Sequence, residues 1–324
     1  MKAAARAGSA GTMWWALAIL ALLWPLAAGA QSSFEEAARW CNRQDPAITL
    51  DSAIAGCGWI IRSSRADARN RAIAHFNRAH WRTEQGDRAG ALADYSEAIR
   101  LNPTYAEAFT NRGILRRAQG DRAGALADME AAIRLDPANA LAFANRGLLR
   151  NQQGDLAGAL ADYTEALRLD PTDGPVFTNR GVLRHLRGDT AGALADYAEA
   201  LRLDPGDALA LANRGVLRHR LGQAEASRAD IAAAIQAAGP GQGWPFGARG
   251  GLALMRDDTA AAAPDIAEAM RRQPDSAWHH ALRAILRERQ GDADAAREDA
   301  AEARRRRPQI EEDVTAYFGL TLPR

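Results

Sequence analysis

The chain repeats itself every 34 residues, and this period limits the folds available to it more than any other feature. The stretch AFTNRGILRRAQGDRAGALADMEAAIRLDP at 108–137 is followed 34 residues later by AFANRGLLRNQQGDLAGALADYTEALRLDP. One extra residue near Gly239 shifts the frame, and seven units lie between Ala72 and Pro308. Because stacked repeats bury apolar surface against their neighbours, the number of units rather than the chain length sets the organisation.

Each unit has the pattern of two antiparallel helices. Apolar and small residues recur at helical spacing on both sides of a Gly-Asp pair such as Gly120 and Asp121, which suits a left-handed C-cap followed by an N-cap. The Leu-Asp-Pro ending at Pro137 stops the second helix, and a small residue such as Gly113 lets the helix axes approach closely. In the sixth unit Pro264 falls inside the second helix, where we expect a kink or looser packing. The predicted fold class is all-α.

The first thirty residues have the pattern of a secretory signal peptide. Lys2 and Arg6 precede an apolar run at 13–26, and small residues at Ala28 and Ala30 suit cleavage. We expect a signal peptide over 1–30, cleavage near Ala30, export, and no membrane insertion of the mature chain. The alternative is an uncleaved anchor, although an apolar run of about 14 residues is shorter than the roughly 20 that a spanning helix needs.

Charge and cysteine content narrow the classes of partner. Without Lys2 and Arg6, 39 basic groups stand against 40 acidic groups, so the balance indicates neither nucleic acid nor an anionic membrane. The two cysteines, Cys41 and Cys57, are expected to form a disulfide in an oxidising compartment, with two buried thiols as the alternative. They lie in 31–71, which we interpret as a divergent N-terminal capping helical segment.

An arginine row and an aspartate row run through all seven units without a break. Each arginine stands sixteen residues before an aspartate, so we expect the two to pair between the helices of one hairpin. The alternative is two independent solvated stripes. The predicted structural pairs in the regular units are Arg112 with Asp128, Arg146 with Asp162 and Arg180 with Asp196.

Two further sets of residues are candidates for contacting a partner. On the first helix of each unit, residues four, seven and eleven apart share one face, which carries an asparagine row: Asn77, Asn111, Asn145, Asn179 and Asn213. A second arginine row without an equally regular acid partner, joined by histidines and tryptophans, predicts a basic and partly aromatic groove: Arg116, Arg150, Arg184, Arg218, Arg287, His185, His219, Arg220, Trp244 and Trp278. The alternatives are local hydrogen bonding for the asparagines and solvated helix surface for the arginines.

The repeated unit resembles the tetratricopeptide repeats, a family with a 34-residue helix-turn-helix, small residues at these offsets and a closing proline. The resemblance covers 72–308, with five regular units at 72–239, two divergent units at 240–308 and a C-terminal capping helix at 309–324. It implies a right-handed superhelical solenoid with a concave groove that holds peptides or proteins. One departure is that Arg112 and Arg116 stand where the family usually has a leucine and an aromatic residue.

The same resemblance implies a role for the asparagine row. In the peptide-binding repeats of co-chaperones and of the O-linked N-acetylglucosamine transferase, asparagines at this offset contact the ligand backbone or a terminal carboxylate. An asparagine amide both donates and accepts hydrogen bonds, so a row of them suits the backbone of an extended segment. The cysteine-bearing segment ahead of the repeats is similar to periplasmic members of the family from Gram-negative bacteria.

No pattern of residues predicts chemistry. The six histidines and two cysteines lack metal-ligand spacing, and phosphate-loop, nucleophile-elbow and metalloprotease motifs are absent from the sequence. We therefore expect no metal, no cofactor and no enzymatic activity. The predicted function is a cell-envelope scaffold whose groove holds an extended protein or peptide segment, and the basic groove predicts acidic groups on that segment. The alternative is a structural subunit or spacer of an envelope assembly or secretion complex that binds through its convex face and ends.

Overall fold

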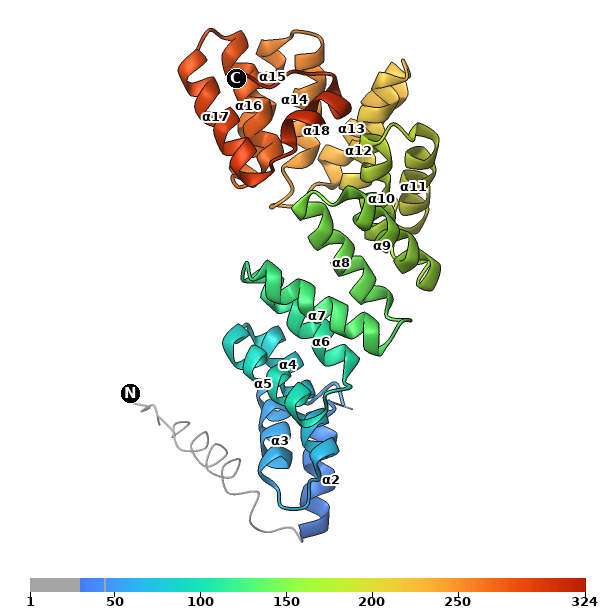
Figure 1. The fold of residues 1–324 in the computed structure, drawn as a ribbon, viewed down its shortest axis with the longest axis vertical. Helices are drawn as coiled ribbons and strands as arrows, with labels where there is room; N and C mark the ends of the chain where they lie inside the picture. Colours follow the sequence, from blue (N-terminus) through green and yellow to red (C-terminus); the bar gives the residue numbers. More distant parts are fainter. Residues whose placement is uncertain (1–29, 44) are drawn as a thin grey trace, which may run out of the picture. The chain divides into compact units, whose positions relative to one another are not determined.

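The computed structural model describes residues 30–43 and 45–324, and within these ranges all regular secondary structure is α-helix. Of the seventeen helices in these ranges, α2 to α17 follow one another as eight antiparallel pairs joined by short turns, and α18 comes last (Figure 1). The all-α fold class predicted from the sequence is confirmed. The proposed signal peptide and its cleavage site lie outside the described residues apart from Ala30.

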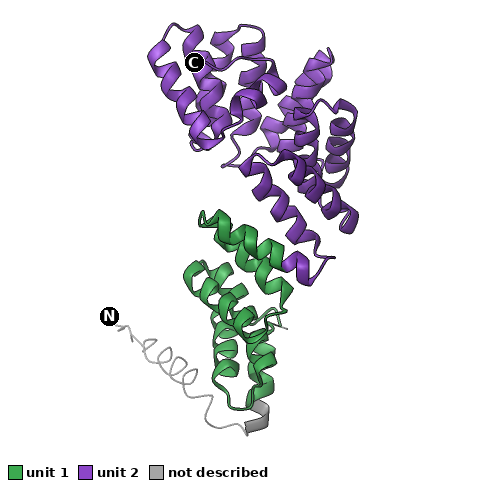
Figure 2. Ribbon diagram, in the orientation of Figure 1, with its two compact units in different colours: residues 1–131 green, residues 132–324 purple. Residues whose placement is uncertain are grey.

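The chain divides into two compact units, 1–131 and 132–324 (Figure 2). The first unit contains a helix pair that precedes the repeats and the first hairpins of the array: α2 (Ala30–Cys41), α3 (Leu50–Arg62), α4 (Ala68–Gln85), α5 (Arg88–Leu101) and α6 (Ala106–Ala118). Helix α7 (Arg122–Leu135) contains the boundary between the two units.

The second unit contains five further hairpins and a last helix. Its helices are α8 (Ala140–Gln153), α9 (Leu156–Leu169), α10 (Gly174–Leu186), α11 (Thr190–Leu203), α12 (Ala208–Arg220), α13 (Ala224–Ala237), α14 (Trp244–Met255), α15 (Thr259–Arg272), α16 (Ala277–Arg289), α17 (Ala293–Arg306) and α18 (Ile310–Phe318). We number the hairpins of the array from the first, α4–α5, to the seventh, α16–α17.

The turn inside each hairpin has the geometry that its Gly-Asp pair predicts. Gly86 ends α4 in the left-handed region at φ 89°, and the side chain of Asp87 accepts a hydrogen bond from the backbone N–H of Gly90 at the start of α5. In the sixth hairpin Asp257 replaces the glycine at φ 62°, a conformation that aspartate tolerates better than most residues. The turn is therefore kept where the glycine is lost.

Small residues on the first helix bring the two helices of a hairpin into close contact. A Cβ atom added at Gly147 would lie 2.9 Å from the ring of Tyr163, and one at Gly181 would lie 2.7 Å from the ring of Tyr197. Both tyrosines are fully buried. The large side chain of the second helix therefore fills the space that the glycine leaves, and a larger residue at the glycine position would separate the helices.

Helix α15 does not show the looser packing expected around Pro264. It is one continuous helix from Thr259 to Arg272, and Ala262, Ile266 and Ala269 on its inner face are buried. Pro264 itself is exposed, so its ring and its missing N–H lie on the solvent side of the helix. None of the described helices has the length and apolar character needed to cross a membrane.

A disulfide joins the two helices that precede the array. Cys41 at the end of α2 and Cys57 in α3 are bonded, with 2.12 Å between their sulfur atoms, and both side chains are buried with Ala37 and Ile60. The indole N–H of Trp81 in α4 donates a hydrogen bond to the backbone carbonyl of Cys41 at 2.8 Å. The bonded pair is thus held against the first hairpin.

We expect that the double variant Cys41→Ser, Cys57→Ser unfolds with a free energy about 3 kcal/mol lower than that of the parent, because a bridge across a loop of this length restricts the unfolded chain by about that amount. Chemical denaturation followed by circular dichroism measures the loss. Thiol counting of the denatured, unreduced parent should find no free thiol, and two free thiols would contradict the disulfide.

Candidate interaction surface

In each hairpin of the array an arginine of the first helix forms an ion pair with an aspartate of the second helix, and we call this contact the clasp. In the third hairpin, Nε of Arg146 donates to Oδ2 of Asp162 at 3.0 Å and Nη2 donates to Oδ1 at 2.7 Å. The same two-bond geometry recurs in all seven hairpins: Arg78–Asp94, Arg112–Asp128, Arg146–Asp162, Arg180–Asp196, Arg214–Asp230, Arg249–Asp265 and Arg283–Asp299. All seven aspartates are buried. The alternative of two independent solvated stripes does not describe this geometry.

The second arginine row contacts the same aspartates, which corrects the expectation that it lacks a regular acid partner. Nη1 of Arg116 lies 2.9 Å from Oδ2 of Asp128, and Arg150, Arg184 and Arg218 reach the aspartates of their own hairpins at 2.8 to 2.9 Å. A carboxylate offers about four lone-pair sites, so one aspartate can accept from two guanidinium groups. These arginines belong to the clasps and do not form a row of unpaired cations.

Hydrogen bonds and positive charge lower the pKa of two of these buried aspartates. Burial on its own raises the pKa of Asp94, but hydrogen bonds from His75 and Arg78 and the charge of Arg82 outweigh it, and the pKa of Asp94 is lowered. The same balance, with hydrogen bonds from Arg283 and His280, lowers the pKa of Asp299. These two carboxylates keep their charge because a histidine and two arginines surround each of them.

We expect Asp162→Ala to lower the free energy of unfolding by about 3 kcal/mol, since it leaves the guanidinium groups of Arg146 and Arg150 partly buried without a counter-charge. Asp155→Ala is a useful comparison, because this exposed aspartate on the same hairpin caps a helix and lies 3.7 Å from Arg150, and its removal leaves the buried carboxylate of the clasp in place. A double-mutant cycle with Arg146→Ala measures the coupling. A loss below about 1 kcal/mol or an absence of coupling would contradict the clasp as a stabilising contact.

The five asparagines do not form a uniform ladder. The side-chain amide of Asn77 donates to Asn42 at 2.8 Å, and that of Asn145 donates to the backbone carbonyl of Leu141 in its own helix at 2.9 Å. Asn213 is buried, and its side-chain oxygen accepts hydrogen bonds from Trp244 and Tyr317. The expectation of equivalent, partner-facing asparagines is therefore wrong for Asn213.

Helix α18 lies across the first helices of the last four hairpins. It contacts α10, α12, α14 and α16 as well as the neighbouring α17, and Figure 1 shows it beside α14. We call the face formed by α10, α12, α14 and α16 the first-helix surface. The residues at 309–324 were expected to cap the end of the array, but α18 covers an inner surface of the second unit as well.

One face of α18 packs against this surface. Its buried residues are three, four, seven and eight positions apart, the spacing of a helix face: Ile310, Asp313, Val314, Tyr317 and Phe318. The hydroxyl of Tyr317 donates to the side-chain oxygen of Asn213 at 2.5 Å, and its ring lies 5.3 Å from that of Trp278 and 5.7 Å from that of Trp244. The tryptophans expected to meet a partner thus meet this chain's own last helix.

The sixth hairpin is shaped to receive α18. Its first helix has Gly251 where the corresponding residues of other units are Ile114, Leu148, Val182 and Val216. A Cβ atom at Gly251 would lie 2.5 Å from the ring of Phe318, so any side chain at this position would collide with the seated helix. The loss of the branched residue creates the space in which Phe318 packs.

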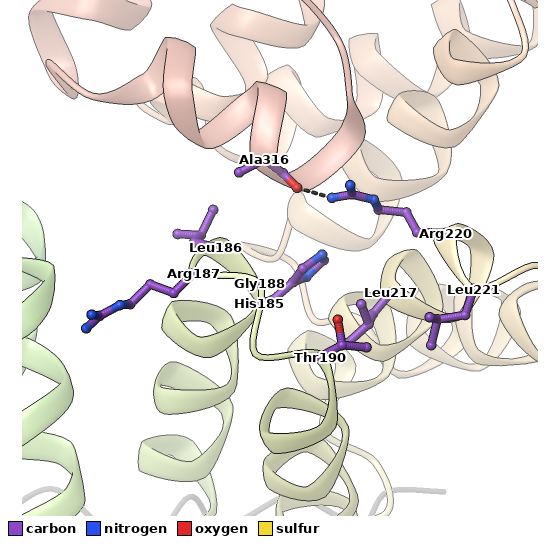
Figure 3. Close-up of a pocket in the computed structure, with 9 residues that line it drawn as sticks. All are labelled: His185, Leu186, Arg187, Gly188, Thr190, Leu217, Arg220, Leu221 and Ala316. Atoms are coloured by element: carbon purple, nitrogen blue, oxygen red, sulfur yellow. Dashed lines mark hydrogen bonds between the residues drawn. The ribbon is translucent and has the colours of Figure 1, made fainter.

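His185 lies at the edge of the site in which α18 is docked, which we call the α18 seat. It is buried, its ring centre lies 4.1 Å from that of Tyr317, and burial followed by the positive charge of Arg220 lowers its pKa to about 4. His185 and Arg220 line a cavity of about 470 Å³ at the ends of α10 and α12, where Arg220 donates a hydrogen bond to the backbone carbonyl of Ala316 (Figure 3). His185 is therefore a neutral residue of the seat and carries no positive charge near neutral pH.

Sequence analysis did not identify Tyr317, Phe318 or Gly251 as functional residues. The apolar positions of 310–318 do predict an amphipathic helix, but the single glycine that makes room for it lies in a divergent unit. His219, which was expected to share a groove with His185, lies in a different cavity. The structure contains no group of three or more potential metal ligands within residues 30–43 and 45–324.

We expect Gly251→Val to displace α18, because the new side chain would occupy the space of the Phe318 ring while keeping a residue that the regular hairpins already carry. Hydrogen exchange at 310–318 should become at least about tenfold faster, as for a loss of 1.4 kcal/mol or more in docking. Glu312→Ala, on the exposed face of α18, is the control and should leave exchange unchanged. Equal protection of 310–318 in both variants would contradict a tight seat.

The fold and the clasped repeats define a helical-hairpin repeat protein, and comparison with known proteins gives its family. The family model described as "Tetratricopeptide repeat" matches residues 110–174 and 187–243, and that described as "TPR repeat" matches residues 79–120. No curated protein matches the sequence. The chain is a tetratricopeptide repeat protein.

Solved structures show the same fold at low sequence identity. The chain is similar to a tetratricopeptide repeat protein from Parabacteroides merdae with a TM-score of 0.59 and 21% identity, over 76% of this chain and 98% of that one. Its TM-score with pilF of Pseudomonas aeruginosa is 0.54 at 20% identity, over 67% of this chain and 99% of that one. At these identities the likeness concerns the fold alone.

Proposed function

We propose that the protein is a non-enzymatic interaction scaffold whose first-helix surface binds a helical segment of a partner protein in the place that α18 occupies. The observation that carries the proposal is the seat itself, in which Gly251 makes room for an aromatic ring and Asn213 and Trp244 surround a second one. A surface that already binds one amphipathic helix has the shape and polarity to bind another.

The contacts of the seat separate into anchoring and positioning groups. Tyr317 and Phe318 are almost fully buried against the two tryptophans, and buried aromatic anchors dominate the energy of most interfaces. Arg220 contacts only backbone carbonyls of α18, so it can position a segment of different sequence. The chemistry therefore favours a partner helix with a pair of neighbouring aromatic residues.

This proposal changes the binding mode inferred from the sequence. An extended segment along five asparagines does not fit the second unit, where Asn213 is covered by α18 and Asn145 bonds its own helix. The remaining asparagine of this surface, Asn179, is half-buried on α10 and lies in the same register as Asn213. We retain it as a residue that the partner segment contacts.

The place of action that we propose is the cell envelope, and specifically the periplasm. The signal-like segment at 1–30 and the bonded pair Cys41–Cys57 support export to an oxidising compartment. The alternative function is a structural subunit or spacer of an envelope assembly or secretion complex that binds through its convex face and ends. Exposed residues of the second helices, such as Ala195 and Ala198 on α11, would belong to such a face.

Site-specific photocrosslinking in cells that produce the protein tests which face is used. A crosslinking residue at position 179 reports on the first-helix surface, and one at position 198 reports on the second-helix face. We expect adducts with a partner protein from position 179, with a yield that rises several-fold when Tyr317→Ala weakens the α18 seat.

Two results would contradict the proposal. Adducts confined to position 198 would favour the structural-subunit alternative. Adducts at position 179 whose yield falls with Tyr317→Ala would mean that α18 is part of the partner's binding site rather than its competitor. Glu312→Ala, which leaves the seat intact, is the matched control and should not alter the yield.

A further inference from the structure

The fifth hairpin departs from the array at the position where its second helix meets the sixth hairpin. In the preceding hairpins the second helix has a leucine at this position: Leu92, Leu126, Leu160 and Leu194. Leu92, Leu160 and Leu194 pack against the cores of their hairpins. The fifth hairpin has Arg228 instead, and Ile231 replaces the tyrosine or methionine three residues later. The side chain of Arg228 is 71% exposed, so the apolar volume of the leucine is missing here.

A cavity of about 540 Å³ lies where this volume is missing. Ile231 and Ala232 of α13 and Leu252 of α14 form its apolar floor. Four basic side chains line the rest: His219, Arg228, Arg249 and Arg256. We call it the α13–α14 pocket. None of its lining residues belongs to the α18 seat.

Two arginines of the α13–α14 pocket, Arg228 and Arg256, lack a buried acid partner, whereas Arg249 is paired with Asp265. Ala253 replaces the second arginine of the sixth clasp, and the side chain of Arg249 is 51% exposed, compared with 13% for Arg112. Arg228 pairs only with Glu225, whose side chain is 95% exposed, at 3.3 Å. Such an exposed pair contributes little and leaves the guanidinium group available.

Arg256 has no acid of its own. It is exposed, and in the described part of the chain no carboxylate lies within ion-pair distance of it. Burial, followed by the positive charge of Arg256, lowers the pKa of His219. Arg256 thus faces the cavity without a counter-charge, which is the electrostatic setting in which a bound anion is stabilised.

We propose that the α13–α14 pocket binds a carboxylate carried on a short apolar stem, such as the side chain of a glutamate in a protein segment. Arg228 and Arg256 supply N–H donors for the carboxylate, because guanidinium groups match carboxylate geometry with two parallel hydrogen bonds. Arg249 donates Nε and Nη2 to Asp265, so only its Nη1 is left for a ligand. Leu252 and Ile231 contact the methylene groups of the stem. Because the site lies between a second helix and the next hairpin, it is independent of the function proposed for the first-helix surface.

Titration calorimetry of the full chain, at constant ionic strength, tests the site with the peptide Ac-Ala-Glu-Ala-NH2, its glutamine counterpart, glutarate and inorganic phosphate. We expect the glutamate peptide to bind and the glutamine peptide to bind at least about tenfold more weakly, as for the loss of a charge-assisted hydrogen bond. Weaker binding of glutarate than of the peptide assigns the carboxylate to a protein segment, and the reverse order assigns it to a free acid. Tighter binding of phosphate than of either carboxylate would overturn the proposal.

Two variants locate the binding in this pocket. Arg228→Leu restores the leucine of the regular hairpins, so it should fill the cavity, keep the protein folded and weaken binding at least about tenfold. Arg256→Gln should weaken binding similarly, and Arg187→Gln, an exposed arginine outside the pocket, should not.

A spectroscopic readout separates ligand binding from a change in stability. The imidazole of His219 can be titrated by nuclear magnetic resonance, and a carboxylate bound beside Arg256 should raise its pKa by compensating the positive charge. An unchanged His219 titration in the presence of saturating peptide, or equal affinity in the parent and in both pocket variants, would overturn the proposal.

Discussion

A buried carboxylate shared between two guanidinium groups is the interaction on which the array depends. Aspartate alone would be costly in the interior of a hairpin, but two arginines from the facing helix supply its counter-charge and satisfy both of its oxygens. The planar fork of Arg146 also fixes the angle and the register at which the two helices meet. Because the pair made by the first arginine recurs in all seven hairpins, with the second arginine in all but the sixth, neighbouring hairpins present matching surfaces and can stack.

The position of the clasp decides which surface remains for binding. Arg146 and Arg150 both point from the first helix toward the second, so the charges of the clasp are paired inside the hairpin. The face of the first helix that carries Asn179 and Asn213 is left with polar and apolar groups of low charge. A low-charge surface with small residues accepts an amphipathic helix, and α18 is such a helix.

The sequence is sufficient to predict the helices, their caps and the first arginine row, because each of these depends on contacts within one repeat. A strict period fixes the helix pairs, and equal numbers of arginine and aspartate at constant spacing indicate their pairing. The sequence is not sufficient to predict the contacts of Arg116 and its equivalents. They bind an aspartate that is already paired with another arginine, and spacing alone does not reveal that one carboxylate accepts from two arginines. Asn77 and Asn213 share a register but differ in their neighbours, which a repeat pattern cannot distinguish.

Long-range contacts account for the rest of what sequence analysis missed. The pattern at 310–318 predicts an amphipathic helix. Where this helix docks depends on Gly251 and Trp244, some 60 residues earlier in the chain. These two residues lie in a unit whose sequence departs from that of the regular repeats. A residue that packs between stacked hairpins must fit the hairpins on both sides. A different residue at such a position is therefore tolerated only where a new contact replaces the lost one.

The sixth hairpin illustrates this replacement at two positions. Phe318 fills the space left by Gly251, and Trp244 is held by Asn213 and the aromatic rings of α18. At a third position, Ala253 stands where the other hairpins have the second clasp arginine, so Asp265 binds Arg249 alone. The positive charge beside the α13–α14 pocket therefore comes from Arg228, which has only an exposed partner, and from Arg256, which has no ion-pair partner in the described part of the chain. A cation that the chain itself does not neutralise is where physical reasoning places an anion from outside.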